Sequence, residues 1–372
     1  MIEGHGDDAW KYDTAIQADF SSNVLYGALD AGLQAHLTTA LAAITHYPEA
    51  GAHSLQTAAA MAYGVAEEGV LVTNGVTEAI YLIAQVFRRY TAVVYTPAFA
   101  EYEDACAAQG MTIIFRNWDE LRRGRLPDNG LVFLCNPNNP TGWTVSLDRM
   151  GEHPDTLFVV DESYIEFAPA AISVLGRGLP NVLVLRSLTK SCRIPGLRVG
   201  FVMGAEALIA RLREGKMPWS VNRLAIEAGL YIFSHPEDFE VPVVSLVAET
   251  RAWQEELRVV LGDDETAAGG VGASGVTAIA WGGGGGGGGR GVGRVGDWKV
   301  WDTDTHYFLI ETPEDWPAYA LKKRLIERYG LLVRDASNFR GLGPNIIRVA
   351  CQTPEHNRLL TKVLRECAGG GR

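Results

Sequence analysis

The sequence has little that would suit a membrane protein or a nucleic-acid-binding protein. No segment of its 372 residues approaches the length of an apolar membrane span, and residues 1–8 are acidic and polar. It contains no basic tract, and its formal net charge of −11 disfavours a surface that binds nucleic acid. We therefore expect a cytoplasmic protein that interacts with neither membranes nor nucleic acid.

Cysteine is also scarce. The chain has five cysteines, an odd number, and their spacing is not that of a metal site. We expect reduced thiols, several of them buried, and no bound metal. With 47% hydrophobic residues, a chain of this length can bury a large core and form two or three structural units.

Apolar strand-like runs alternate with helical runs from about residue 70 to residue 203. This alternation predicts an α/β fold with a mostly parallel sheet. Residues 243–260 have the pattern of a long amphipathic helix that leads into a second unit. In that unit we expect strands over 276–281, 306–310 and 346–350, and helices over 316–329 and 354–367.

Residues 282–289 form an unbroken glycine run inside a glycine-rich stretch over 282–296. Without side chains to bury, such a run cannot offset the entropy lost on ordering, so we expect a mobile loop between two strands. No helix start of the kind that binds phosphate follows it, which disfavours a phosphate-binding role.

The most informative residue is Lys190, which stands directly after Thr189 and directly before Ser191, eight residues ahead of Arg198. A lysine that forms a Schiff base with pyridoxal 5′-phosphate needs hydroxyl groups and an arginine nearby to hold the phosphate of that cofactor. The alternative is an ordinary solvated lysine after a strand. The motif therefore makes Lys190 a candidate for covalent catalysis.

Two polar segments follow buried strand patterns upstream of this lysine. Residues 136–142 form a proline-rich turn whose amide side chains can donate hydrogen bonds to a phenolate oxygen. Asp161 ends the apolar run 157–160, and a carboxylate there is costly to bury unless it meets a cation, such as a protonated pyridine nitrogen. The alternative for Asp161 is a cap of the next turn.

A third segment adds an anion site. The apolar run 70–73 leads into residues 74–78 and then into a helical pattern. The free backbone amides of a helix N-terminus can bind a phosphate, although a simple cap would show the same pattern. The three segments and Lys190 together supply every part that the cofactor needs.

At this point the chain resembles the fold-type I pyridoxal-phosphate enzymes. The resemblance is to the aminotransferase class I/II branch, which holds histidinol-phosphate aminotransferase and threonine-phosphate decarboxylase. It spans nearly the whole chain and implies a three-layer large domain like that of aspartate aminotransferase, with a smaller α+β domain. The implied boundaries are 1–23 for an N-terminal segment that joins the small domain, 24–240 for the large domain and 241–372 for the small domain. The motifs that carry the resemblance are residues 74–78, 97–102, 136–142, 160–164 and 187–200.

The resemblance implies a role for each matching residue. Lys190 would bind the cofactor aldehyde, and Asp161 would pair with the pyridine nitrogen. Asn139 and Tyr164 would bond the phenolate oxygen, and Tyr102 would stack on the ring. The implied phosphate ligands are Gly75, Val76, Thr77, Ser187, Thr189 and Arg198, together with Tyr47 from the partner subunit of a homodimer with shared sites.

Substrate binding is also implied by the resemblance. Arg348 matches an arginine that binds the substrate carboxylate, a task that suits a bidentate guanidinium. Residues 333–342 resemble the threonine-phosphate decarboxylases more than the aminotransferases, whereas Gln352 stands where those decarboxylases often carry arginine. A second site, for a substrate phosphate, would use some of His5, Asn23, Tyr26 and Arg340.

We predict first an aminotransferase that acts on a small amino compound, which can carry a phosphate, as histidinol-phosphate aminotransferase does. A decarboxylase like threonine-phosphate decarboxylase is the second reading, because both reactions use the same cofactor and differ in which bond is held perpendicular to its ring. A non-catalytic binding protein is a third reading, which the intact set of lysine, aspartate, asparagine and arginine disfavours.

Overall fold

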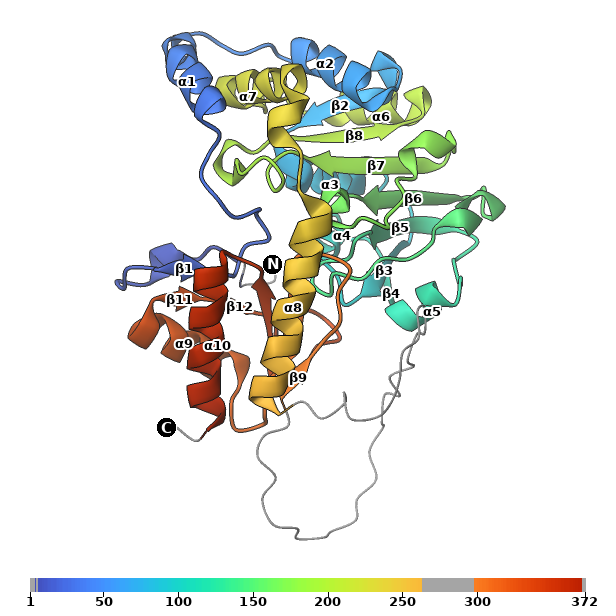
Figure 1. Ribbon diagram of the computed structural model, residues 1–372. Helices are drawn as coiled ribbons and strands as arrows, with labels where there is room; N and C mark the ends of the chain where they lie inside the picture. Colours follow the sequence, from blue (N-terminus) through green and yellow to red (C-terminus); the bar gives the residue numbers. More distant parts are fainter. Residues whose placement is uncertain (1–3, 5, 263–297, 370–372) are drawn as a thin grey trace.

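The computed structural model describes residue 4, residues 6–262 and residues 298–369 (Figure 1). The strand expected over 276–281 and the glycine-rich stretch 282–296 lie outside the described residues. Within the described part, no helix is long and apolar enough to span a bilayer. All five cysteines are buried and carry free thiols.

A seven-stranded sheet forms the centre of the larger unit (Figure 1). Every strand pair is parallel except those of β8, which runs antiparallel to both β2 and β7. Strands β5, β6 and β7 are buried at every residue, as expected when helices cover both faces of a parallel sheet. The expected mostly parallel α/β fold is therefore confirmed. In sheet order, the strands are β2 (Val70–Thr73), β8 (Gly200–Gly204), β7 (Val182–Ser187), β6 (Thr156–Asp161), β5 (Gly130–Cys135), β3 (Ala92–Thr96) and β4 (Ile113–Asn117).

Successive side chains along these strands point to opposite faces of the sheet, so each face packs into its own hydrophobic core. The sheet and the helices on its two faces form three layers. One face packs against α3 (Gly75–Val86), α4 (Glu101–Ala108) and α6 (Glu206–Gly215). The other face packs at one end against α2 (His53–Tyr63) and α7 (Arg223–Ser234), and at the other end against α5 (Trp118–Arg122). Helix α1 (Ala31–Ala40) lies beside α7 at the edge of this layer.

The smaller unit is built on a four-stranded antiparallel sheet. Helix α8 (Val243–Leu261) connects the two units: Leu246 belongs to the core of the large unit, whereas Trp253 and Leu257 belong to the core of the small one (Figure 1). The other elements are β12 (Arg334–Asp335), β13 (Ile346–Ala350), β10 (Tyr307–Glu311), β9 (Lys299–Val300), α9 (Ala318–Tyr329) and α10 (Pro354–Ala368).

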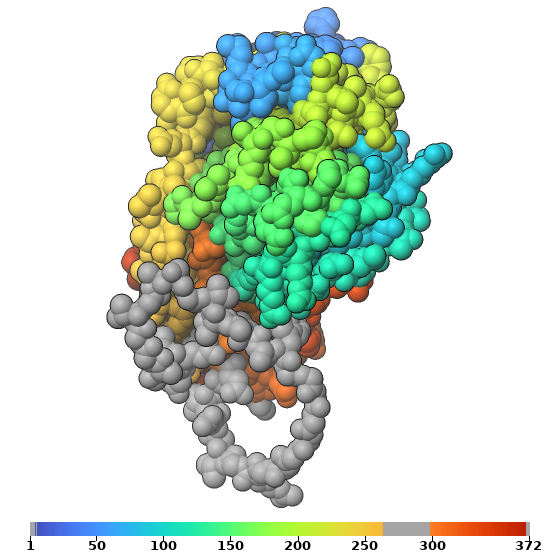
Figure 2. Space-filling view, turned by 90° about the vertical axis from the view of Figure 1, so that its right-hand side faces the viewer, coloured from blue at the N-terminus to red at the C-terminus, as the bar shows by residue number. Residues whose placement is uncertain are grey.

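The N-terminal segment packs against the small unit. Strand β1 (Ala18–Asp19) pairs in parallel with β11 (Leu331–Leu332), and Phe20 is fully buried in the small unit's core. The two units also meet through Trp143, whose ring stacks on Trp301 with 5.6 Å between ring centroids. In Figure 2 the orange and red small unit lies against the lower end of the large one. The exact domain boundaries stay a prediction.

Candidate active site

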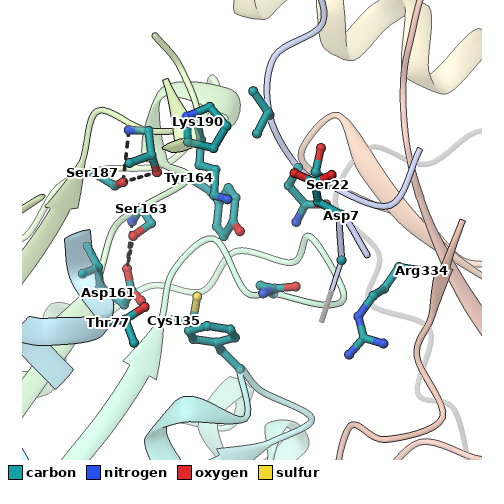
Figure 3. A pocket seen from close by; sticks show the side chains of 18 of the residues that line it. Asp7, Ser22, Thr77, Cys135, Asp161, Ser163, Tyr164, Ser187, Lys190 and Arg334 are labelled. Atoms are coloured by element: carbon teal, nitrogen blue, oxygen red, sulfur yellow. Dashed lines mark hydrogen bonds between the residues drawn. The ribbon is translucent and has the colours of Figure 1, made fainter. Parts of the chain in front are cut away.

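Segments from both units line a single cavity of about 230 Å³ (Figure 3). The carboxyl ends of β5, β6 and β7 provide one wall, as is usual for ligand sites in open α/β sheets. The N-terminal segment and the antiparallel pair β12–β13 provide the opposite side. In Figure 3, Asp7 and Arg334 lie across the cavity from Lys190 and Asp161.

Lys190 lies in the turn after β7 and lines the cavity. Burial and the nearby charges of Arg198 and Arg348 together lower the pKa of its amine to about 8. A sizeable fraction of the amine is therefore neutral near pH 7 to 8, which is the nucleophilic form. The turn is held by Ser187, whose hydroxyl shares a 2.7 Å hydrogen bond with the hydroxyl of Thr189 and accepts one from its backbone N–H (Figure 3).

Asp161 is the last residue of β6 and is buried at the cavity wall. Its Oδ1 accepts hydrogen bonds from the Ser163 hydroxyl at 2.6 Å and the Ser163 backbone N–H at 3.0 Å, and its Oδ2 accepts one from the Tyr102 hydroxyl at 2.7 Å. Burial raises the pKa of the carboxyl above its ordinary value, and these donors and Lys190 offset only part of that rise. Asp161 makes no ion pair with any other described residue, although the charge of Lys190 acts on it, and such a carboxylate can pair with a cationic group of a ligand.

The expected stacking role of Tyr102 is wrong. Tyr102 is fully buried in α4, stacks on Phe133 with 5.3 Å between ring centroids, and does not line the cavity. Phe99, three residues earlier and just before the helix, lines the cavity instead. The physical reason is that Tyr102 lies in the first turn of α4, where its side chain faces the sheet.

An anion-binding cluster forms where α3 begins. Val76 and Thr77 line the cavity, and the cap residue Asn74 makes no side-chain capping bond, so the first backbone amides of the helix have no such acceptor. Arg198 lies beside them and makes no ion pair within the described residues. Gly75 does not line the cavity. It adopts φ +72°, and a Cβ there would stand 2.5 Å from Nη2 of Arg198, so glycine lets the guanidinium approach.

Asn139, one of the two residues expected to bond the phenolate oxygen of the cofactor, is hydrogen-bonded to the small unit. Arg348 of β13 donates from Nη1 to Oδ1 of Asn139 at 2.5 Å and from Nη2 to the carbonyl of Ser21. Because Arg348 uses the Asn139 oxygen, the amide nitrogen is the group left to donate into the cavity. Tyr164 lines the same wall, and burial raises its phenol pKa well above the usual range, so its hydroxyl stays a donor.

The residues expected from sequence to bind the substrate phosphate are only partly brought together at the cavity. Asn23 is buried at the cavity, but Tyr26 and Arg340 do not line it, and His5 lies outside the described residues. The Tyr26 hydroxyl donates to Glu249 at 3.3 Å. Arg340 is half-exposed and forms a 2.5 Å ion pair with Glu103 of α4, so its charge already has a partner outside the cavity.

Two charged cavity residues were missed by the sequence reasoning. Arg334 of β12 lies directly opposite Arg348 in the strand register, and both side chains line the cavity. Burial and the charge of Arg348 lower the pKa of Arg334 to about 9, and Arg334 contacts backbone carbonyls and Asn338 but no carboxylate among the described residues. The second missed residue is Asp7, which adopts φ +56° and whose backbone N–H donates to the Ser21 hydroxyl at 2.8 Å.

Tyr47 does not line the cavity of its own chain. Its side chain is 85% exposed, and its ring lies 5.6 Å from that of Trp219. This position is compatible with a contact to a second subunit.

The cavity offers a nucleophilic lysine, a carboxylate that makes no ion pair within the described part of the chain, and a cluster of amides, hydroxyls and a guanidinium. These are the groups needed to bind the aldehyde, the pyridine nitrogen and the phosphate of pyridoxal phosphate. The clustering of Lys190, Asp161 and Arg198 around one cavity therefore fits this cofactor.

Comparisons with known proteins agree with this geometry. The family described as aminotransferase class I and II matches residues 15–273. The threonine-phosphate decarboxylase of Salmonella typhimurium is 29% identical over 95% of this chain and 91% of its own length. A histidinol-phosphate aminotransferase of Desulfitobacterium hafniense (strain DCB-2) is 27% identical over 90% of this chain and 87% of its own.

A solved structure supports the same relationship. The L-threonine-O-3-phosphate decarboxylase of Porphyromonas gingivalis superposes with a TM-score of 0.77 at 32% identity, covering 93% of this chain and 97% of that one. The cofactor is pyridoxal 5′-phosphate. The chain therefore belongs to the aminotransferase class I and II family of pyridoxal-phosphate-dependent enzymes.

Proposed function

We propose that this enzyme decarboxylates a small phosphorylated amino acid, as threonine-phosphate decarboxylases do. The observation that carries the proposal is the pair Arg334 and Arg348, which line one cavity from adjacent strands and have no carboxylate partner among the described residues. A phosphorylated amino acid presents two anions at once, a carboxylate and a phosphate. The similarity to the two decarboxylases above supports decarboxylation as the first candidate and aminotransfer as the second, which is the reverse of the ranking predicted from sequence.

Each of these cavity residues has its own role in the proposed reaction. Bound pyridoxal phosphate supplies an electron sink for cleavage of a bond at the substrate Cα. Arg348 binds the substrate carboxylate and is itself anchored by Asn139 and the Ser21 carbonyl, so the carboxylate is held in a fixed direction. Arg334 binds the phosphate at the other end. The Lys190 amine moves a proton at Cα, a task suited to an amine with a pKa of about 8.

Aminotransfer is the second candidate, because the same two arginines could bind a phosphorylated amine and a dicarboxylate in alternation. The decisive experiment incubates the holoenzyme with O-phosphothreonine, and separately with histidinol phosphate plus 2-oxoglutarate. We expect carbon dioxide from the first mixture and no glutamate from the second. Glutamate formation without carbon dioxide release would establish the aminotransferase instead.

The role of Arg334 leads to a specific prediction. We expect Arg334→Gln to raise KM for a phosphorylated substrate by about ten- to a hundredfold, since a charge-assisted hydrogen bond is worth roughly 1.5–3 kcal/mol. Inhibition by inorganic phosphate should weaken in parallel. Arg340→Gln is the matched control, because that arginine pairs with Glu103 outside the cavity, and it should leave KM unchanged. If the Arg340 variant shows the larger effect, the phosphate site is misplaced.

We also propose a homodimer in which Tyr47 reaches the cofactor phosphate of the partner subunit, since its side chain is exposed and absent from its own cavity. Mixed dimers of Lys190→Ala chains and Tyr47→Ala chains should recover activity, because one site in each hybrid receives an intact lysine and an intact tyrosine. Each parent dimer alone serves as the control. Hybrids that form but stay as inactive as their parents would show that the tyrosine does not act across the interface.

A further inference from the structure

Two hydroxyl groups converge on the Asp161 carboxylate from different elements. The Tyr102 hydroxyl reaches Oδ2 from α4 at 2.7 Å. The Ser163 hydroxyl reaches Oδ1 from the turn after β6 at 2.6 Å (Figure 3). The backbone N–H of Ser163 adds a third donor at 3.0 Å. Asp161 is thus held through both oxygens before any cofactor binds.

Toward an ionised Asp161 the Tyr102 hydroxyl can act only as a donor. Tyr102 is fully buried, its ring is fixed by stacking on Phe133, and both burial and the Asp161 charge raise its phenol pKa well above the usual range. A phenol that stays protonated beside a carboxylate acceptor must give its proton to that hydrogen bond. Tyr102 is also outside the cavity, so neither the cofactor nor the substrate competes for it.

Hydrogen bonds to a carboxylate stabilise its ionised form and reduce its affinity for a proton. When such a carboxylate faces a pyridine nitrogen, the proton between them stays on the nitrogen. The other titratable groups whose charges act on Asp161 or respond to it are Lys190, Cys135 and Tyr164. Burial raises the pKa of the Cys135 thiol and of the Tyr164 phenol far above neutrality, so Lys190 is the one among them that titrates near neutral pH.

We propose that Tyr102 and Ser163 are positioning residues that keep Asp161 ionised and aligned, so that the shared proton stays on the pyridine nitrogen of the cofactor. This inference rests on the pairing of Asp161 with that nitrogen. It does not depend on whether the substrate then loses its carboxylate or its amino group.

The test observes the nitrogen directly. Wild-type protein and the variants Tyr102→Phe, Ser163→Ala and the double variant are reconstituted with pyridoxal phosphate labelled with ¹⁵N in the ring, and the ¹⁵N chemical shift is measured. We expect a pyridinium shift in the wild type, a shift toward neutral pyridine in each single variant and the largest change in the double variant. We expect kcat to fall about tenfold in each single variant, with KM nearly unchanged.

Tyr95→Phe is the matched control. Tyr95 is also a buried tyrosine whose hydroxyl donates a single hydrogen bond, but its acceptor is the carbonyl of Arg125 rather than Asp161. This variant should lose stability as Tyr102→Phe does while its ¹⁵N shift stays that of the wild type. Ser163→Thr, which retains a hydroxyl, should restore the wild-type shift.

Two results would overturn the proposal. If Tyr102→Phe and Ser163→Ala lower the unfolding temperature but leave the nitrogen a full pyridinium, the hydroxyls are merely structural. If the wild type itself holds a neutral nitrogen, the pairing with Asp161 is also wrong. Should Tyr102→Phe fail to fold, Ser163→Ala against Ser163→Thr decides the question alone. A wrong choice between decarboxylation and aminotransfer would change the products and leave these shifts as expected.

Discussion

Lys190→Ala is expected to abolish turnover while the protein keeps its fold and part of its affinity for pyridoxal phosphate. The proposed phosphate ligands at the start of α3 and Arg198 remain in this variant, but the amine proposed to capture the aldehyde is gone. Borohydride treatment followed by peptide mass spectrometry should fix the cofactor to Lys190 in the wild type and to no residue in the variant. Label on another lysine of the variant, with activity retained, would move the assignment elsewhere.

The chain offers a matched control for this substitution. Lys216 is also partly buried with a lowered amine pKa, but its Nζ donates to Ser220 at 2.7 Å and it does not line the cavity. Lys216→Ala should therefore keep both label and activity. The rate at which apoprotein captures the cofactor should also rise with pH through about 8, because the pKa of Lys190 is lowered to about 8 and only the neutral amine reacts.

Asp161→Asn is expected to reduce kcat by at least about a hundredfold, roughly 2.7 kcal/mol in the barrier, while cofactor affinity falls much less. An amide can still bond to a nitrogen, but it carries no charge to keep that nitrogen protonated, so the ring becomes a weaker electron sink. Single-turnover kinetics together with a cofactor-binding titration separate the two effects. A variant within about tenfold of the wild type would show that Asp161 is mainly structural.

Asp30→Asn is a suitable control for the loss of a carboxylate. Asp30 caps α1 by accepting a hydrogen bond from the Leu33 backbone N–H at 2.8 Å, and asparagine caps helices about equally well. We expect unchanged kcat and unchanged cofactor binding. A loss comparable to that of Asp161→Asn would indicate a general effect of charge removal rather than a local one.

Much of the candidate cofactor site could be predicted from local sequence. Asp161, Asn139 and Lys190 each follow a buried apolar run, and Thr77 follows another. Because the carboxyl ends of parallel strands meet at one edge of a sheet, residues after successive strands come together without any knowledge of long-range contacts. The mostly parallel sheet followed from the same periodicity. These features depend on short segments of the chain, and a sequence pattern contains the information that such local structure requires.

Side-chain direction at the end of a helix was decided by tertiary structure. Phe99 and Tyr102 are three residues apart in one aromatic motif, and the sequence reasoning selected Tyr102, although Phe99 is the one that lines the cavity. Their directions depend on where α4 begins and on how it packs against Phe133 of β5. The resulting contact between Tyr102 and Asp161 joins residues that are 59 positions apart, which no local pattern encodes.

The choice between Arg334 and Arg340 shows the same limit. Both arginines lie in one loop-rich stretch, and β12 is only two residues long, too short to leave a periodic signal. Pairing with β13 places Arg334 opposite Arg348 at the cavity, while Glu103 of α4 draws Arg340 to the surface. The sequence by itself determined the cofactor chemistry, because its ligands follow individual strands. The tertiary structure alone decided that Arg334, rather than Arg340, lines the cavity with Arg348, because strand register and ion pairing between distant segments orient those side chains.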